Sequence, residues 1–171
     1  SIVKPSPTVA ISSLAQDLKR AGRDIIGLAA GEPDFATPQN IRAAAKAAME
    51  AGHTKYTAPD GIIELKEAIV AKFKRDNNLQ YSTSQISVST GGKQVLYNAL
   101  MATLNPTDEV IIPAPYWVSY PDMTLLAEGV PVIVSAGIEQ AYKISPEQLE
   151  DAITDRTRLI FINSPSNPTG A

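Results

Sequence analysis

The stretch LIFINSPSNPTG, residues 159–170, combines a short apolar run with a polar loop that two prolines interrupt. The apolar run is rich in β-branched and aromatic residues, which is typical of a buried strand. The loop then follows the carboxyl end of that strand, and open α/β sheets bind ligands at this edge. Asn167 stands between Pro165 and Pro168, so its amide side chain is held in a restricted direction. Because Asn-Pro and Thr-Gly pairs are also common in turns, the stretch by itself fits either a ligand-binding loop or an ordinary turn.

Strand and helix patterns alternate through the sequence that leads to this stretch. Apolar runs predict strands at residues 24–29, 86–88, 109–112, 130–134 and 158–162. Apolar periodicity and capping residues predict helices at residues 8–21, 39–51, 62–77, 94–104, 118–128 and 146–152. The alternation predicts an α/β fold with a mostly parallel sheet and helices on both faces.

The N-terminal arm and the first helix precede this alternation. We therefore expect a boundary near residue 36, with residues 1–36 in an arm and part of a smaller domain. Residues 37–171 would then belong to a larger domain that carries the parallel sheet.

Composition excludes several classes of function. The chain has 171 residues, 44% of them hydrophobic, and a formal net charge of -3. The negative charge gives no electrostatic case for binding nucleic acid or an anionic membrane. The chain lacks cysteine and its one histidine is His53, which argues against disulfides, metal sites and Ser-His catalysis. No apolar run approaches the length of a membrane helix, so we expect a cytoplasmic protein.

Gly91-Gly92-Lys93 lies between a predicted strand and a predicted helix. Two glycines let the backbone approach a ligand, and the helix start presents N–H groups that suit a phosphate. A tight turn that binds nothing is the alternative. Lys93 at a helix start opposes the helix dipole, which indicates an anionic partner or simply a solvated lysine.

Two aromatic residues are further candidates. Trp117 follows a predicted strand and could stack on a planar ring, although a packed core or interface tryptophan is the alternative. Tyr56 lies in an irregular stretch and is either a hydroxyl donor or a surface residue. Gly91-Gly92, Trp117 and Asn167 all follow predicted parallel strands, so they are expected at one edge of the sheet. A phosphate site, a stacking ring and an amide at one edge suit a planar, phosphorylated cofactor.

Together these residues resemble the class I/II aminotransferases, pyridoxal-phosphate enzymes of fold type I. The resemblance covers essentially the whole chain, and within that family it is greatest to the bacterial aspartate and aspartate/prephenate aminotransferases. It is carried by Gly31-Glu32-Pro33-Asp34-Phe35, Lys55-Tyr56-Thr57 with Asp60-Gly61, Gly91-Gly92-Lys93-Gln94, Pro115-Tyr116-Trp117 and Asn167-Pro168-Thr169-Gly170.

The resemblance implies how pyridoxal 5'-phosphate is held. Gly91, Gly92 and Lys93 would bind its phosphate, mainly through backbone N–H groups. Tyr56 would reach the phosphate of the neighbouring subunit, which implies a homodimer with shared active sites. Trp117 would stack on the pyridine ring.

The resemblance also implies the substrates, an amino acid and a 2-oxo acid. Asn167 would bind the phenolic oxygen of the cofactor ring and the region of the substrate α-carboxylate, next to Trp117. Gly31 would contact substrate through its backbone, and Lys93 would bind the distal carboxylate of a dicarboxylic substrate. The bonds Ala114–Pro115 and Asn167–Pro168 are expected to be cis.

The family also needs a Schiff-base lysine, an aspartate at the pyridine nitrogen and an arginine for the α-carboxylate. No lysine of this chain stands in the Schiff-base context, so we expect an N-terminal portion of a larger enzyme that is inactive alone. The expected reaction of that enzyme transfers an amino group between aspartate and a 2-oxo acid such as 2-oxoglutarate or prephenate. A lyase or decarboxylase with the same cofactor cradle, or an inactive fragment, are the alternatives.

Overall fold

The computed structural model describes residues 5–28 and 31–171 of the chain. Contacts within the chain divide it into two units. One unit comprises Gly91–Ala171 together with Ser1–Val9, and the other comprises Ala10–Thr90. The expected boundary near residue 36 concerns the domains of a complete enzyme, and it stays a prediction.

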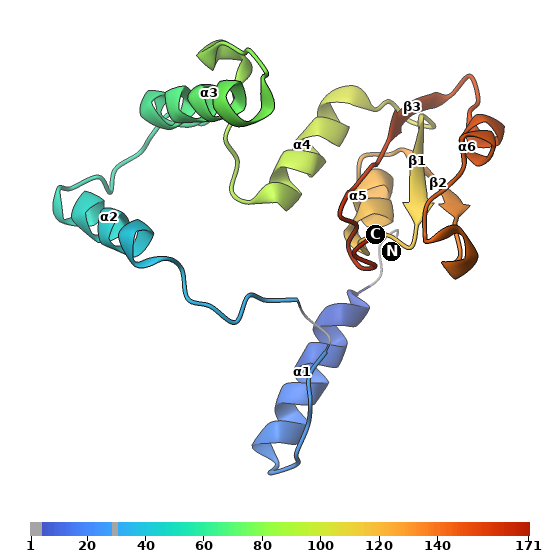
Figure 1. Cartoon of the computed structure of the whole chain (residues 1–171), viewed down its shortest axis with the longest axis horizontal. Helices are drawn as coiled ribbons and strands as arrows, with labels where there is room; N and C mark the ends of the chain where they lie inside the picture. Colours follow the sequence, from blue (N-terminus) through green and yellow to red (C-terminus); the bar gives the residue numbers. More distant parts are fainter. Residues whose placement is uncertain (1–4, 29–30) are drawn as a thin grey trace. The chain divides into compact units, whose positions relative to one another are not determined.

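The unit that contains Gly91–Ala171 is built on a sheet of three parallel strands (Figure 1). The strands are β1 (Glu109–Ala114), β2 (Val130–Ser135) and β3 (Thr157–Ile160), in the spatial order β2-β1-β3. β1 is the central strand and pairs with β2 from Glu109–Val130 to Ala114–Ser135. Its pairing with β3 is irregular between Glu109 and Val110. The predicted parallel α/β sheet is confirmed.

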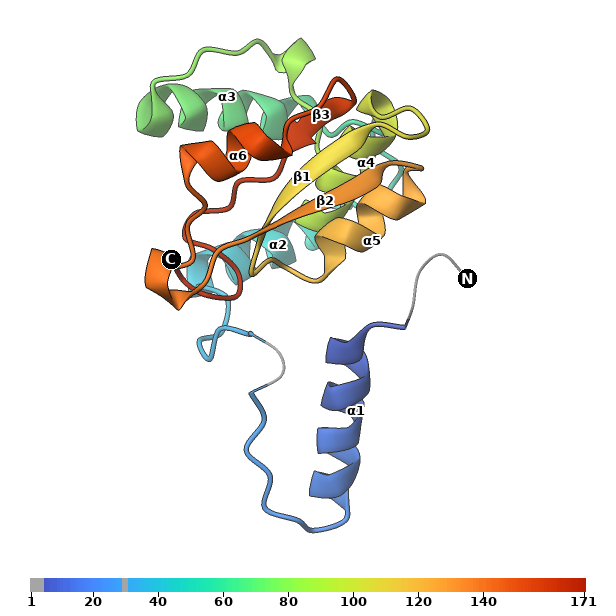
Figure 2. The ribbon, with the colours of Figure 1, turned by 90° about the vertical axis from the view of Figure 1, so that its right-hand side faces the viewer.

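Helices cover both faces of this sheet, and the alternation of side chains along β1 and β3 separates the two faces. Val110 and Ile112 pack against Tyr120 of α5 (Ser119–Leu126) and Leu100 of α4 (Gly92–Thr103). α6 (Pro146–Ala152) contacts β2 and lies on the other side of the sheet from α5 (Figure 2). α5 joins β1 to β2 and α6 joins β2 to β3, so each parallel connection contains a helix.

The core of this unit lies between β1 and the two helices α4 and α5. Leu100, Val110 and Ile112 are each at most 1% exposed. Burial of an aliphatic side chain of this size contributes roughly 1.5–3 kcal/mol. Leu159 and Phe161 add to the same cluster from the β3 side. This packing holds the carboxyl ends of β1 and β3 in fixed relative positions.

The start of α6 is fixed by its own sequence. Ser145 Oγ accepts a hydrogen bond from the Gln148 N–H at 3.2 Å, and the Gln148 side chain accepts one from the Ser145 N–H at 2.9 Å. Ser145 is therefore the cap of the helix predicted at residues 146–152. The Gln148 amide also donates to the Ser135 carbonyl at 3.1 Å, which ties α6 to the end of β2.

The amino end of β1 carries a buried acidic residue. Glu109 is 4% exposed and accepts hydrogen bonds from the Thr154 hydroxyl at 2.6 Å and from Arg156 Nε at 2.9 Å. The hydrogen bond from Thr154, and then the one from Arg156, hold the pKa of Glu109 below its usual 4.5. Because ligand sites of parallel sheets lie at the carboxyl edge, we assign this cluster a structural role.

The unit Ala10–Thr90 is mostly helical. Its helices are α2 (Gln39–Glu50), α3 (Ile63–Asn77) and most of α1 (Pro7–Arg20), followed by a short 3-10 turn at Thr83–Gln85. The ring of Phe73 in α3 meets Tyr81 edge-on at 5.8 Å between centroids. Within the described parts of the chain, no helix combines the length and the apolar character needed to cross a membrane.

Two predicted strands of this unit are wrong. The described residues 24–28 and residues 86–88 form no strand, and residue 29 of the first segment lies outside the described residues. The apolar residues Ile26 and Leu28 are 85% and 91% exposed. A strand needs a neighbour for its backbone hydrogen bonds, and the described residues offer these two segments no such ladder. An apolar run therefore indicates that a segment could form a strand, but it does not show whether a neighbouring strand is present to pair with it.

Candidate functional site

The glycine pair forms the start of α4. Gly91 caps the helix with φ 81°, a left-handed conformation that glycine adopts without strain. The helix begins at Gly92, two residues before the predicted Gln94, so Lys93 lies in its first turn. Gly91, the cap residue, has no side chain that could accept a hydrogen bond from this end. Since the first N–H groups of a helix lack intrahelical acceptors, this end can bind an anion such as a phosphate.

Trp117 lies in the loop after β1, beyond the cis bond Ala114–Pro115. It is partly buried, and the Lys93 ammonium lies 4.9 Å from the centroid of its indole ring. The predicted cis bond is confirmed. The start of α4 and the loop after β1 therefore meet, although residues 86–88 before α4 form no strand of the sheet.

An aromatic array continues from this tryptophan into the core. The Trp117 ring meets Tyr120 edge-on at 5.5 Å, and Tyr120 stacks on Phe161 at 4.3 Å with an angle of 11° between the planes. Aromatic pairs of these geometries contribute about 0.5–1.5 kcal/mol beyond their buried area. Trp117 is therefore oriented by packing that reaches β3. Sequence reasoning missed Tyr120 and Phe161 because their contacts join α5 to β3.

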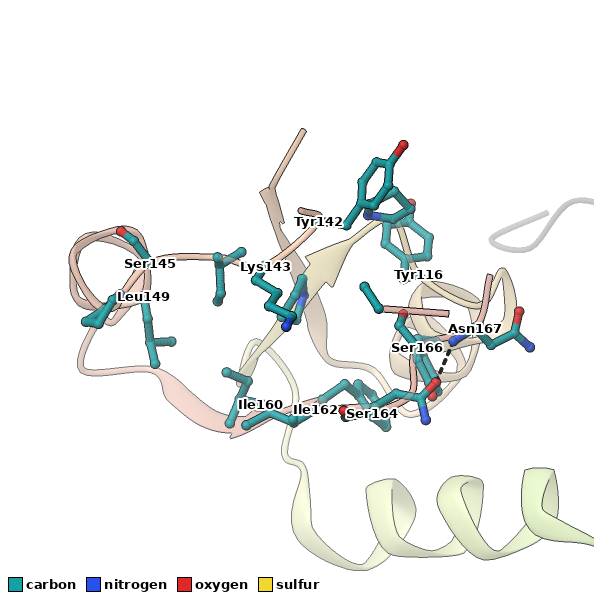
Figure 3. A pocket seen from close by; sticks show the side chains of 18 residues that line it. Tyr116, Tyr142, Lys143, Ser145, Leu149, Ile160, Ile162, Ser164, Ser166 and Asn167 are labelled. Carbon is teal, nitrogen blue, oxygen red and sulfur yellow. Dashed lines mark hydrogen bonds between the residues drawn. The ribbon is translucent and has the colours of Figure 1, made fainter. Parts of the chain in front are cut away.

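The loop after β3 carries Asn167. The Asn167 N–H donates to the Asn163 side-chain oxygen at 2.8 Å (Figure 3), and the Ser166 N–H donates to the Ala171 carbonyl at 2.7 Å. Two bonds of the loop are cis, Asn167–Pro168 as predicted and also Ser164–Pro165. The Asn167 side chain is exposed.

A cavity of about 450 Å³ lies beside this loop, and the sequence did not predict it. Asn167 and Tyr116 line it, together with residues from α6, β3 and the connection between β2 and α6 (Figure 3). The lining residues missed from the sequence include Tyr142, Lys143, Leu149, Ile160, Ile162 and Ser164. The alternation in residues 159–162 carried part of this signal, because Leu159 packs against the core and Ile160 and Ile162 line the cavity, whereas Phe161 does both.

Two predicted site residues lie in the other unit. Gly31 and Tyr56 both belong to Ala10–Thr90 and are exposed, and the Tyr56 side chain is fully accessible. The structure thus brings together Gly91, Gly92, Lys93 and Trp117 at one edge of the sheet.

The comparison with known sequences decides the family. A sequence model of aminotransferase class I and II matches residues 23–171. The chain belongs to this family. An aspartate/prephenate aminotransferase of Cereibacter sphaeroides is 68% identical over 169 residues, and that of Nitrosomonas europaea is 58% identical. These matches cover 99% of the chain but only 42% and 43% of the two relatives. The chain therefore spans less than half of the length of these relatives.

Solved aminotransferase structures share the α/β fold. An aspartate aminotransferase of Thermus thermophilus with maleate is 48% identical, with a TM-score of 0.93 over 96% of the chain and 43% of that structure. An aspartate aminotransferase of Rhizobium meliloti is 49% identical, with a TM-score of 0.91 over 97% of the chain and 42% of that structure.

Proposed function

We propose that the full-length protein containing this chain is a pyridoxal-phosphate-dependent aminotransferase that uses aspartate and a 2-oxo acid. The acceptors proposed are 2-oxoglutarate and prephenate, because the relatives above are named aspartate/prephenate aminotransferases. We further propose a cytoplasmic homodimer. The exposure of Tyr56 supports this assembly, since its side chain is available to a second subunit.

The observation that carries the proposal is the meeting of the start of α4 with Trp117 through Lys93. A helix that begins at a glycine pair suits the phosphate of the cofactor, and a neighbouring indole suits its flat ring. The bound cofactor would supply an electron sink for the α-carbon of the amino acid. The residues of the chain thus fit the group that the family uses.

The residues of this chain would bind and orient the cofactor. Gly91, Gly92 and Lys93 would hold the phosphate through backbone N–H groups, and Trp117 would restrict the tilt of the ring. The Asn167 amide would donate to the phenolic oxygen of the ring and favour negative charge on that atom.

The remaining assignments complete the site. Gly31 would contact the substrate through its backbone, and Tyr56 would donate to the phosphate in the neighbouring subunit. The Lys93 side chain would pair with the distal carboxylate of a dicarboxylic substrate. The Schiff-base lysine, the aspartate for the pyridine nitrogen and the arginine for the α-carboxylate are proposed to lie outside these 171 residues.

A half-reaction assay on the full-length protein with pyridoxal phosphate tests the reaction class. With aspartate alone we expect oxaloacetate in stoichiometric amount, and glutamate only after 2-oxoglutarate is added. Release of ammonia or carbon dioxide without amino transfer would identify a lyase or decarboxylase instead. The 171-residue chain is expected to be inactive in the same assay.

A further inference from the structure

α3 contains a buried lysine. Lys66 is 7% exposed and its ammonium pairs with the carboxylate of Asp60, whose side chain remains 55% exposed. Among the described residues, the buried side chains of the charged types are Lys66 and Glu109. A charged group is costly to bury unless a partner holds it. The hydrogen bond from Lys66 holds the pKa of Asp60 below its usual 3.8, so the carboxylate stays charged as the partner.

The backbone around Asp60 is attached on a second side. The Val88 N–H donates to the Asp60 carbonyl at 3.0 Å, and the Gly61 N–H donates to the Ala58 carbonyl at 3.1 Å. Gly61 has φ +105°, and a Cβ there would meet Val88 Cγ2 at 2.7 Å. Residues 58–61 are therefore held between α3 and the segment around Val88. This attachment lies within Ala10–Thr90.

The attached loop carries Tyr56. Residues 54–58 contain no helix or strand, and the Tyr56 side chain is fully exposed. The segment around Val88 leads directly into Gly91, where α4 begins. In the sequence, the contacts of Asp60 with Lys66 and Val88 therefore lie between Tyr56 and Gly91, both of which the proposed function assigns to a cofactor phosphate.

We propose that Lys66 is a positioning residue for cofactor binding, which acts through Asp60 to hold the loop of Tyr56 in place. The inference rests on the proposed function, because it needs Tyr56 to donate to the phosphate. Lys66 itself touches neither cofactor nor substrate. Lys66 would keep the loop of Tyr56 ordered before the phosphate binds. The loop would then lose less conformational entropy on binding.

The dissociation constant of pyridoxal phosphate tests the proposal in the full-length protein. It is measured by titrating the apoprotein of four forms, namely the wild type, Lys66→Met, Tyr56→Phe and the double variant. We expect Lys66→Met to raise the constant about tenfold when Tyr56 is present and to change it little in the Tyr56→Phe background. Lys66→Arg should retain most of the affinity, because its guanidinium can still pair with Asp60.

Lys72→Met is the matched control. Lys72 lies on the same helix, but its side chain is 50% exposed and pairs with Asp76 at 4.0 Å. This variant should leave the dissociation constant unchanged. If Lys66→Met does not fold, Asp60→Ala provides the same cycle, because it removes the acceptor of Lys66 at a side chain that is 55% exposed.

The outcomes separate this proposal from the proposed function. Equal losses from Lys66→Met in both backgrounds would mean that Lys66 only stabilises the fold, and they would overturn the proposal. A loss from Tyr56→Phe with none from Lys66→Met overturns the role of Lys66 alone. No loss from Tyr56→Phe overturns the assignment of Tyr56 to the phosphate, and the role of Lys66 with it.

Discussion

The Lys93 ammonium lies over the Trp117 indole, 4.9 Å from the ring centroid. A contact of this kind contributes about 0.5–1 kcal/mol at an exposed position. It joins the first turn of α4 to the loop after β1, two segments that are distant in the sequence. The proposed phosphate and ring sites are therefore neighbours in the folded chain.

Replacement of Trp117 should weaken binding of pyridoxal phosphate. Trp117→Ala removes the stacking surface and its contact with Tyr120, so we expect the dissociation constant to rise by roughly tenfold. Trp117→Phe keeps a flat ring and should lose less. Titration of the apoproteins of the full-length variants measures both values. Equal affinity of Trp117→Ala and wild type would contradict a stacking role.

Lys93→Met should affect dicarboxylic substrates selectively. If the Lys93 side chain pairs with the distal carboxylate, the KM for aspartate should rise about tenfold while the KM for alanine changes little. Phosphate binding should be largely retained, because the backbone N–H groups remain. Steady-state assays with the two amino acids measure the difference. A parallel loss for both would place the Lys93 side chain at the cofactor instead.

Gly91→Ala should destabilise the protein, whereas Gly92→Ala should not. Both positions have open space for a Cβ, so packing does not distinguish them, but Gly91 has φ 81°. With its ψ of 158°, Gly91 lies in a region essentially restricted to glycine, where another residue costs roughly 1–3 kcal/mol. Urea unfolding of the full-length variants measures this difference in the free energy of unfolding. If both variants unfold alike, the conformation at Gly91 does not contribute as argued.

The sequence predicted most helices of the chain because their signals are local. The cap at Ser145 and the apolar stripe of α3 lie within a few residues, and both elements formed where expected. α4 began at Gly92 and not at Gln94, because the glycine pair itself closes the first turn. Residues 24–28 and 86–88 formed no strand, because a strand depends on a distant partner.

Prediction of the site was limited in the same way, because contacts between distant segments cannot be read from local sequence. The loop of Trp117 was correctly placed after a parallel strand, whereas Gly91 lies near it although the strand predicted at residues 86–88 did not form. The cavity beside Asn167 could not be predicted, since it needs the distance between α6 and β3. The Lys66–Asp60 pair was also missed, because a lysine within a charged helix gives no sign of burial before the fold is known.

Glu109 should make the stability of the fold depend on pH in the acid range. Its pKa is lowered in the folded state by Thr154 and then by Arg156, so the unfolded state binds a proton more readily. The stabilisation is therefore present above the usual pKa of 4.5 and is lost as pH falls through the folded value. Glu109→Gln should lower the melting temperature near pH 7, and the gap to wild type should shrink below pH 4.5.

The exposed Glu67 of α3 provides the control for this prediction. Glu67→Gln should leave the melting temperature close to that of the wild type over the whole pH range. A constant gap between Glu109→Gln and wild type down to about pH 3 would show that the substitution acts through packing rather than charge.

Borohydride reduction of the full-length holoenzyme should label no lysine within these 171 residues. Lys93 is assigned to the phosphate end of α4 and contacts Trp117, while Lys66 is buried against Asp60. Lys143 lines the cavity beside Asn167, so it is the strongest rival for the covalent attachment. Peptide mass spectrometry after reduction locates the cofactor, and Lys143→Gln should leave the labelling unchanged. A label on Lys143, Lys93 or Lys66 would contradict the proposal that the Schiff-base lysine lies elsewhere in the enzyme.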